Sequence, residues 1–366
     1  MARIIYEDDL EDISRGAAVL GTGGGGNPYV GKLLAQRAIR DCGPVTLVDA
    51  DEVPADAVVV QAAMMGAPTV MVEKLPRGDE ALLALRGLQD FLGKPVTHVV
   101  CGEAGGINST IPFAVAAQAG LPLVDADGMG RAFPELQMLI PGMLGVSATP
   151  MVVADEKGNT VLLRTTGNEW TERLARTATI EMGCSALIAC YAMSGQQVRD
   201  TMVLGTLTLC ADLGRIIRLA RAAHDDAVRA VADRLDGHLI FQGRVSDIER
   251  RTETGFARGR AVLAGTGEWA GTDLVLNFQN EHLVAIRDGT VIASVPDLII
   301  VLNSENAEPI TTEEIRYGFR VSVVAAPCDP RWQTAEGLAL VGPEYFGYDF
   351  PYVSVTERLA AERRPR

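Results

Sequence analysis

The chain has 366 residues, of which 48% are hydrophobic and 22% are charged, and its formal net charge is −14. This balance is typical of a folded globular protein long enough for two domains, and it argues against an intrinsically disordered chain. The negative charge argues against nucleic acid as a partner, because binding phosphates requires clustered Lys and Arg.

The first half of the chain alternates helical and strand patterns. An amphipathic segment at 7–20 predicts a helix that runs into the loop Gly21–Gly26, and Pro28 precedes a second helix over 29–41. Short β-branched runs then alternate with helical patterns, which is typical of parallel strands joined by crossover helices. The predicted strands are Val45–Val48, Ala57–Gln61, Thr97–Cys101 and Leu121–Val124, and the helices are 79–92 and 108–119. We therefore predict a doubly wound parallel sheet over residues 1–166.

The segment around this boundary consists of a hairpin and a connecting helix. Hydrophobic runs at 150–154 and 160–165 flank a turn, and they predict a hairpin that closes the first domain. A helical pattern at 168–181 follows, and we expect it to connect the two halves.

The second half, residues 167–366, is richer in strands. Residues 184–193 predict a strand and residues 195–235 predict two helices. Short strands then alternate with turn signals such as Asp288-Gly289. These predicted strands are Leu239–Gln242, Arg260–Gly265, Thr272–Phe278, Leu283–Arg287, Val291–Val295, Leu298–Val301 and Phe319–Ala325. We predict a β-rich α+β domain, either an antiparallel sheet or a small barrel.

Targeting and redox features indicate a cytoplasmic protein without membrane contact. The first residues, MARIIYEDDLED, are acidic and lack the apolar core of a signal peptide. No apolar run reaches the roughly 18–20 residues that a membrane span needs. The six cysteines are scattered without a CxxC pair, which is typical of reduced core residues.

The glycine loop Gly21–Gly26 resembles a dinucleotide fingerprint, but that fingerprint needs a strand directly before it. The preceding segment is predicted to be a helix, which disfavours NAD or flavin as a cofactor. One alternative is a loop whose free N–H groups, at Gly23, Gly24, Gly25, Gly26 and Asn27, meet an anionic or carbonyl group of a ligand. The other is a tight turn that requires positive φ.

Polar side chains follow two neighbouring predicted strands. Glu103 and Asn108 come after the first of these strands, and Asp125, Asp127 and Arg131 come after the next. Ligands of open α/β sheets bind at this edge, so these groups are candidates for a general base, a metal ligand or a substrate clamp. Alternatively, the two aspartates cap turns and Arg131 pairs with a glutamate four residues later.

Other catalytic patterns are weak. The four histidines show no HxH or HExxH pairing, so a divalent metal would have to use carboxylates, with Glu103, Asp125 and Asp127 as candidates. No GxSxG elbow is present, and Cys184 reads as a small buried residue more readily than as a nucleophile. Asn280 and Glu281 either reach over the edge of the first domain or are ordinary sheet-edge polar residues.

Five segments together resemble the S-methyl-thiohydantoin desulfurase family, formerly a domain of unknown function found beside hydantoinase and oxoprolinase genes. The resemblance spans nearly the whole chain and is most specific in the sequence DADGMGRAFPE. It implies an amino-terminal Rossmann-like domain and a carboxy-terminal β-rich domain. The segments are Gly21–Gly26, Glu103–Asn108, Val124–Glu135, Gln279–Glu281 and Val341–Gly347.

The resemblance also implies an activity, namely hydrolysis of the S-methyl carbon–sulfur bond on a thiohydantoin ring, with release of methanethiol. For this chemistry, we expect Glu103, Asp125 and Asp127 to supply the general base and the ligands of any metal ion. Asn108 would orient the ring and Arg131 would bind a carboxylate arm. The glycine loop would donate N–H groups to the ring carbonyl.

Two alternatives to this hydrolase remain open at the level of sequence. One is an accessory subunit of a hydantoinase-type or oxoprolinase-type complex, and the other is a dinucleotide-dependent oxidoreductase that uses the glycine loop. The size and apolar runs of the chain favour a homo-oligomer. The expected ligand is a small molecule.

Overall fold

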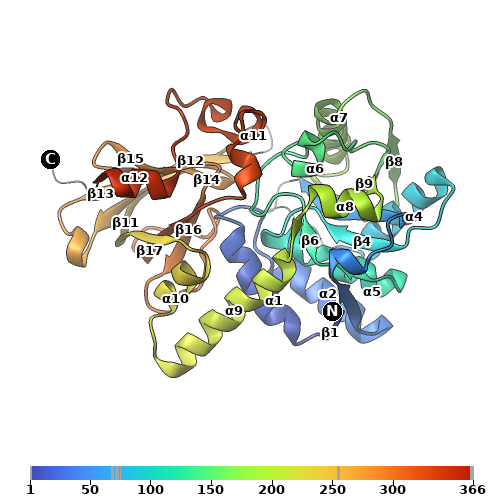
Figure 1. Ribbon diagram of the computed structural model, residues 1–366, viewed down its shortest axis with the longest axis horizontal. Coiled ribbons are helices and arrows are strands. Elements are labelled where there is room, and N and C mark those ends of the chain that lie inside the picture. The colour runs from blue at the N-terminus through green and yellow to red at the C-terminus, as the bar shows by residue number, and fades with distance from the viewer. Residues whose placement is uncertain (1, 67–69, 71–73, 75, 254–255, 363–366) are drawn as a thin grey trace.

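Two sheets organise the chain, an eight-stranded mixed sheet in the first half and a seven-stranded antiparallel sheet in the second. The computed structural model describes residues 2–66, 70, 74, 76–253 and 256–362. Figure 1 shows the two sheets side by side, with α1 (Asp9–Leu20) and α9 (Thr206–Ala223) running below their junction. The predicted fold class, a parallel α/β region followed by an antiparallel β-rich region, is confirmed.

The first sheet has the strand order β1-β2-β5-β4-β3-β9-β7-β8. Its middle strands β2, β5, β4 and β3 pair in parallel, and the remaining pairs are antiparallel. The strands are β1 (Arg3–Ile5), β2 (Val45–Val48), β3 (Val59–Gly66), β4 (His98–Cys101), β5 (Leu123–Val124), β7 (Met151–Ala154), β8 (Thr160–Leu163) and β9 (Ser185–Met193). Two short strands, β6 (Ala126–Asp127) and β10 (Val203–Leu204), pair separately.

Strand β9 belongs to the first sheet although it lies beyond residue 166, where the sequence prediction divides the chain. It pairs with β3 on one side and β7 on the other, so the first sheet takes a strand from beyond that residue. Its sequence SALIACYAM is almost wholly buried, as expected of a strand covered on both faces. The helix α7 (Asn168–Glu181) therefore returns the chain to the same sheet instead of leading into the second half.

Helices cover both faces of the first sheet. In Figure 1, α5 lies below the strands and α7 lies above them. Three helices occupy the stretch 195–235, where the sequence predicted two. The remaining helices are α2 (Tyr29–Cys42), α4 (Glu80–Leu92), α5 (Ile111–Ala119), α6 (Ile140–Met143), α8 (Gly195–Thr201), α10 (Ala227–Arg234), α11 (Ala335–Val341) and α12 (Val355–Glu362).

Helices α1 and α9 approach closely because each presents a glycine to the other. A Cβ on Gly16 would lie 1.8 Å from the carbonyl oxygen of Cys210, and one on Gly214 would lie 1.9 Å from that of Asp12. A side chain at either position would therefore push the helices apart. None of the helices in the described part of the chain is long and apolar enough to cross a membrane.

The second sheet has the order β15-β14-β13-β12-β11-β17-β16. Its strands are β11 (His238–Glu253), β12 (Phe256–Gly265), β13 (Asp273–Gln279), β14 (Glu281–Arg287), β15 (Thr290–Ser294), β16 (Leu298–Asn303) and β17 (Arg320–Ala326). Of the two predicted forms, the structure has the antiparallel sheet. Between β13 and β14 the turn is reduced to Asn280, which has a positive φ of 58°. This tight turn brings Glu281 to the junction between the two sheets.

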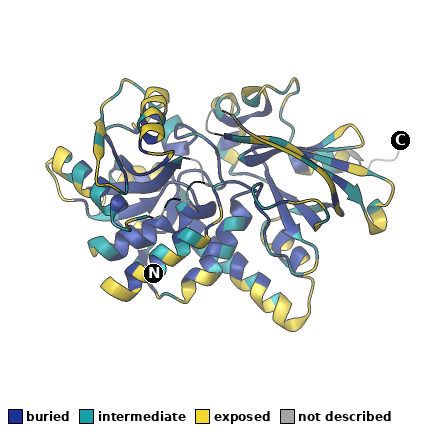
Figure 2. Ribbon diagram, turned by 180° about the vertical axis from the view of Figure 1, so that it is seen from behind, coloured by how far each residue is buried: buried dark blue, intermediate teal, exposed yellow. Residues whose placement is uncertain are grey.

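The hydrophobic core is continuous across that junction. One face of the second sheet, including Leu283, Val295 and Ile300, belongs to the same buried cluster as the first sheet. Its other face forms a smaller cluster around Phe241 and Leu263. In Figure 2 the strands of both sheets are largely buried and the outer surface of α9 is exposed. The two parts are therefore held by shared packing, which fixes any site between them.

Candidate active site

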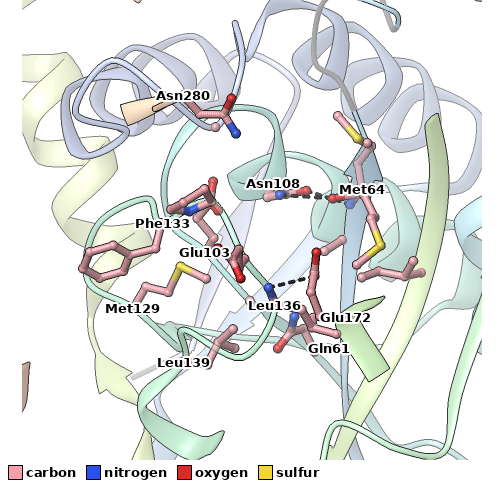
Figure 3. A pocket seen from close by; sticks show the side chains of 18 of the residues that line it. Gln61, Met64, Glu103, Asn108, Met129, Phe133, Leu136, Leu139, Glu172 and Asn280 are labelled. Carbon is pink, nitrogen blue, oxygen red and sulfur yellow. Dashed lines mark hydrogen bonds between the residues drawn. The ribbon is translucent and has the colours of Figure 1, made fainter. Parts of the chain in front are cut away.

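A pocket with an empty volume of about 660 Å³ lies at the junction of the two sheets (Figure 3). Its floor comes from the carboxyl ends of β3 and β4 and from the loop after β4. The segment 129–139 and α7 form its sides, and the β13–β14 turn closes it from the second sheet. The lining residues are Gly25, Gln61, Ala63, Met64, Met65, Gly66, Gly102, Glu103, Asn108, Met129, Phe133, Pro134, Glu135, Leu136, Leu139, Glu172, Arg176, Ile188, Asn280 and Glu281.

Glu103 lies in this pocket on the loop that follows β4. The loop is fixed from both sides, since the Cys101 thiol donates to the Glu103 carbonyl oxygen at 2.8 Å and the Ala104 N–H donates to Asp127 at 2.9 Å. The Glu103 side chain is 7% exposed, and no described residue donates to its Oε1. Burial, then the neighbouring Glu281, raises the pKa of Glu103 well above its ordinary value. The site therefore favours the protonated form of this carboxyl.

Glu281 enters the pocket from the second sheet. Its Oε1 accepts a hydrogen bond from the Gly25 N–H at 3.2 Å, and its buried Oε2 has no partner among the described residues. Burial raises the pKa of Glu281 to about 8, while the charge of Arg131 and the Gly25 N–H act in the opposite direction. Arg131 and the Gly25 N–H therefore favour the ionised form of Glu281.

The glycine loop lies between these two glutamates. A Cβ on Gly24 would lie 2.1 Å from Oε1 of Glu281, and a Cβ on Gly25 would lie 2.6 Å from Oε1 of Glu103. The loop follows helix α1, whereas a dinucleotide fingerprint follows a strand. Its glycines therefore make room for the carboxyl groups, and the one N–H that reaches them, from Gly25, is donated to Glu281.

The other residues of the glycine loop that were predicted to bind substrate make their contacts outside the pocket. Gly23 presents its carbonyl oxygen to the N–H of Thr312 at 2.7 Å, and Gly24 donates to the Gly21 carbonyl at 2.8 Å. Gly26 does not line the pocket. Asn27 donates to Glu314 at 2.5 Å and lines a separate groove. Of the loop residues predicted to bind substrate, the structure brings Gly25 to the site.

Two asparagines lie where the sequence predicted them. The Oδ1 of Asn108 accepts the Met64 N–H at 2.7 Å, which fastens the end of β3 to the loop after β4 (Figure 3). A hydrogen bond from Asn108 also favours the ionised form of Glu103. Asn280 uses its Oδ1 to accept the Ala257 N–H at 2.9 Å and lines the pocket from above in Figure 3.

Asp125 and Asp127 take structural positions instead of the catalytic ones expected from the sequence. Neither aspartate lines the pocket. Asp125 accepts the Leu207 N–H at 2.9 Å, the Thr208 N–H at 3.1 Å and the Thr208 hydroxyl, so it caps the start of α9. Asp127 accepts three backbone N–H groups, from Ala104, Met129 and Gly130. Although burial raises the pKa of Asp127 to about 6, its oxygens are already occupied.

Arg131 is fully buried and also lies outside the pocket lining, where the sequence predicted a clamp for a carboxylate arm. Its guanidinium stacks 4.7 Å from the centre of the Phe133 ring. Its N–H groups are taken up by acceptors from both halves of the chain, which are Ala132 O, Thr22 Oγ1, His282 O, Pro296 O and Asp297 O. The structure therefore supports a role in joining the two sheets.

Several lining residues were not identified from the sequence. Gln61 is the one polar residue of the otherwise apolar strand β3. A polar residue inside an apolar strand is a signal from which it could have been found. Glu172 on α7 accepts the Leu136 N–H at 3.0 Å and pairs with Arg176. Nothing in the local sequence distinguishes that pair from an ordinary i,i+4 pair on a helix surface.

The donor set in the described residues does not favour a metal ion. No group of three or more His, Cys, Asp or Glu side chains suited to holding one is found there. The three carboxylates predicted as ligands diverge, since Asp125 and Asp127 serve backbone N–H groups outside the pocket. The arrangement is instead that of two interacting carboxyl groups with different affinities for a proton, which suits general acid–base chemistry.

Comparison with known proteins places this geometry in context. Residues 8–165 match the family model described as S-Me-THD-like, N-terminal domain, and residues 166–355 match S-Me-THD-like, C-terminal domain. The crystal structure of a protein from Chromobacterium violaceum superposes with a TM-score of 0.80 at 26% identity, covering 96% of this chain and 100% of that one. A search of curated proteins finds no significant match.

Proposed function

Because the chain belongs to the S-Me-THD-like family, the S-methyl-thiohydantoin desulfurases, we propose that it is a hydrolase that removes the S-methyl group from an S-methyl-thiohydantoin ring. The products are methanethiol and a hydantoin. The observation that supports this proposal is the buried pair Glu103 and Glu281, whose unpartnered oxygens lie in the lining of one pocket. Such a pair supplies one base and one acid.

In this proposal Glu281 is the base. It ionises first because Arg131 and the Gly25 N–H stabilise its charge. Its carboxylate takes a proton from water as the oxygen adds to the ring carbon that bears sulfur. That carbon is amidine-like, so addition places electron density on a ring nitrogen.

Glu103 is the acid. Burial and Glu281 raise its pKa and favour its protonated form, and in this proposal it donates that proton to the ring nitrogen as water adds. The tetrahedral adduct then loses methanethiolate, which leaves with the proton that Glu281 took from water. As the carbon–sulfur bond breaks, the hydroxyl group of the adduct gives its proton to the Glu103 carboxylate and becomes the carbonyl. Glu103 is thereby protonated again, and the released hydantoin carries on its ring nitrogen the proton that Glu103 first donated.

The remaining lining supports a small ring with a methylthio group. Met64, Met65, Leu139 and Ile188 give the pocket an apolar side. Methionine side chains are flexible and polarisable, which suits contact with a thioether. Because both carboxyl groups are buried, the electrostatic effect of each on the other is stronger than it would be in water.

The test is methanethiol release from an S-methyl-thiohydantoin that carries a propionate arm. We expect Glu103→Gln and Glu281→Gln each to lower kcat at least about a hundredfold, the size of effect typical of general acid–base groups. The matched control is Glu80→Gln, because Glu80 is a buried carboxyl that accepts two backbone N–H groups away from this pocket. Glutamine keeps one of these two acceptor oxygens and the loss lies outside the pocket, so full activity of the folded variant is expected.

A chelation arm addresses the metal. We expect turnover to survive removal of divalent ions, and its loss would assign the nucleophile to metal-bound water. Absence of turnover by folded wild-type protein would contradict the proposal. It would favour the alternative of an accessory subunit, which predicts co-purification with a hydantoinase-type partner.

A further inference from the structure

Gln61 is a buried amide side chain that faces the pocket from the middle of the first sheet (Figure 3). Its strand pairs with β4 at Val100 and with β9 at Cys190, so its backbone is fixed on both sides. The side chain is 2% exposed, and its Oε1 has no hydrogen-bond partner among the described residues. A buried amide oxygen without a donor costs free energy, so an unmet oxygen in a pocket lining marks a contact reserved for a ligand.

The glycine after β4 fixes how this amide lies. A Cβ on Gly102 would be 2.2 Å from Nε2 of Gln61, so the amide packs directly against the backbone there. Any larger residue at position 102 would displace it. The orientation of Gln61 is therefore built into the strand and loop that also carry Glu103.

Gln61 is not alone in lacking a donor. Oε1 of Glu103 and Oε2 of Glu281 are also buried and have no partner in the described part of the chain, and all three residues line the same pocket. Among the described lining residues the one arginine, Arg176, already pairs with Glu172. These three oxygens therefore leave hydrogen-bond acceptors open in the pocket lining. A complementary ligand presents N–H groups to it.

We propose that Gln61 Oε1 accepts a hydrogen bond from a ring N–H, so that the pocket selects cyclic ureides and cyclic amidines with an unsubstituted ring nitrogen. This inference takes the ring class from the proposed function but concerns binding, which is measured without turnover. Gln61 differs from the two glutamates because its amide carries no charge at any pH. It therefore accepts a hydrogen bond from the ring N–H whatever the protonation states of the two glutamates.

The probes are hydantoin, 1-methylhydantoin and 3-methylhydantoin, and calorimetry measures their affinity for wild type and for Gln61→Met. In wild type we expect one of the two methylated rings to bind at least tenfold more weakly than hydantoin. In Gln61→Met, which is close to isosteric, we expect hydantoin to lose about tenfold in affinity and the discrimination between the rings to disappear. A penalty that is merely steric persists in the variant.

The matched control is Gln137→Met. Gln137 is also buried with an unpartnered Oε1, but it does not line the pocket. We expect it to leave both affinity and discrimination unchanged. Equal binding of all three rings by wild type, no binding of hydantoin, or full discrimination by Gln61→Met would each overturn the proposal. The wild-type comparison needs no variant, so it holds even if Gln61→Met fails to fold.

The methanethiol assay separates this inference from the proposed function. Selective hydantoin binding without methanethiol release contradicts the proposed hydrolysis and leaves the role of Gln61 intact. Methanethiol release together with equal binding of the three rings supports the proposed hydrolysis and contradicts the proposed role of Gln61.

Discussion

Two buried carboxyl groups make the stability of this protein depend on pH. The pKa of Glu281 is about 8 in the folded chain, against an ordinary value of 4.5. Below 4.5 the group is protonated in the folded and unfolded states, so it costs nothing. As pH rises from 4.5 to about 8 the folded state holds the proton more tightly, and stability is lost over this window.

Glu281→Gln removes that loss. We expect the variant to gain stability relative to wild type as pH rises from 5 to 8.5, by a few kcal/mol at the upper end. Thermal unfolding at several pH values measures the difference. An equal fall of both proteins across the range would show that Glu281 ionises normally in the folded chain.

Gly24 controls the position of the same carboxylate. Its φ is not in the left-handed region, so an alanine there meets a steric obstacle alone, since its Cβ would lie 2.1 Å from Oε1 of Glu281. We expect Gly24→Ala to displace Glu281 and lower kcat at least tenfold while the protein stays folded. Gly167→Ala is the control, because a Cβ at Gly167 has no atom within 4 Å. Full activity of Gly24→Ala would separate the loop from the chemistry.

The sequence identified part of the site because polar residues at strand ends are a sound indicator. Glu103 and Asn108 follow β4 and both line the pocket, while their roles stay predictions. Asp125 and Asp127 follow β5 in the same way, yet Asp125 caps α9, a helix that begins some eighty residues later. Local sequence does not reveal which carboxylates will accept hydrogen bonds from backbone N–H groups that are distant in sequence. For the same reason the sequence left open whether Glu281 reaches over the edge of the first domain or is an ordinary sheet-edge residue.

At the scale of elements, the contact between α1 and α9 depends on small residues. Gly214 lies inside α9, where alanine would ordinarily raise helix stability by up to about 1 kcal/mol. Here its Cβ would lie 1.9 Å from the Asp12 carbonyl oxygen. We therefore expect Gly214→Ala to lower the free energy of unfolding by about 1–3 kcal/mol, the usual range for overpacking.

Chemical denaturation measures this effect. Gly87→Ala in α4 is the matched control, because the nearest atom to its Cβ is a Val152 side-chain methyl group at 3.3 Å and not a backbone atom at 1.9 Å. We expect that substitution to be close to neutral. A stabilised Gly214→Ala would mean that the two helices are free to move apart.

The elements themselves were largely predictable, and their order in the sheet was not. The strand at 184–193 was predicted within one residue of β9, from its apolar run. Its place between β3 and β7 depends on pairing with segments far away in sequence, such as Gly66 with Ser185. A strand buried on both faces has no polar alternation to show which sheet it joins. The domain division after residue 166 stays a prediction. The first sheet extends beyond that residue, because it includes β9.

At the scale of the whole molecule, the pocket exists because two sheets are held in one arrangement. The first supplies Glu103 and the second supplies Glu281, so any change in their relative position alters the distance between acid and base. Arg131 links the two parts through acceptors on both sides, among them Thr22 and Asp297. Burial lowers the pKa of Arg131 to about 10, so it stays charged at neutral pH.

Arg131→Lys tests this link. An ammonium group cannot reproduce the planar set of donors, so several buried carbonyl oxygens lose their partners. We expect the free energy of unfolding to fall by about 3 kcal/mol or more, measured by denaturant titration. Arg320→Lys is the control, because that arginine is 72% exposed in a surface ion pair and is expected to change stability by less than about 0.5 kcal/mol.

The same variant decides between the two roles given to Arg131. A residue that joins the sheets affects substrates with charged and uncharged arms alike, because it acts on the spacing of Glu103 and Glu281. A clamp for a carboxylate arm, as expected from the sequence, affects the charged substrate alone. If Arg131→Lys kept its stability and raised KM tenfold only for the substrate with a carboxylate arm, the guanidinium would have to leave its buried acceptors on substrate binding, and the two sheets would have to move with it.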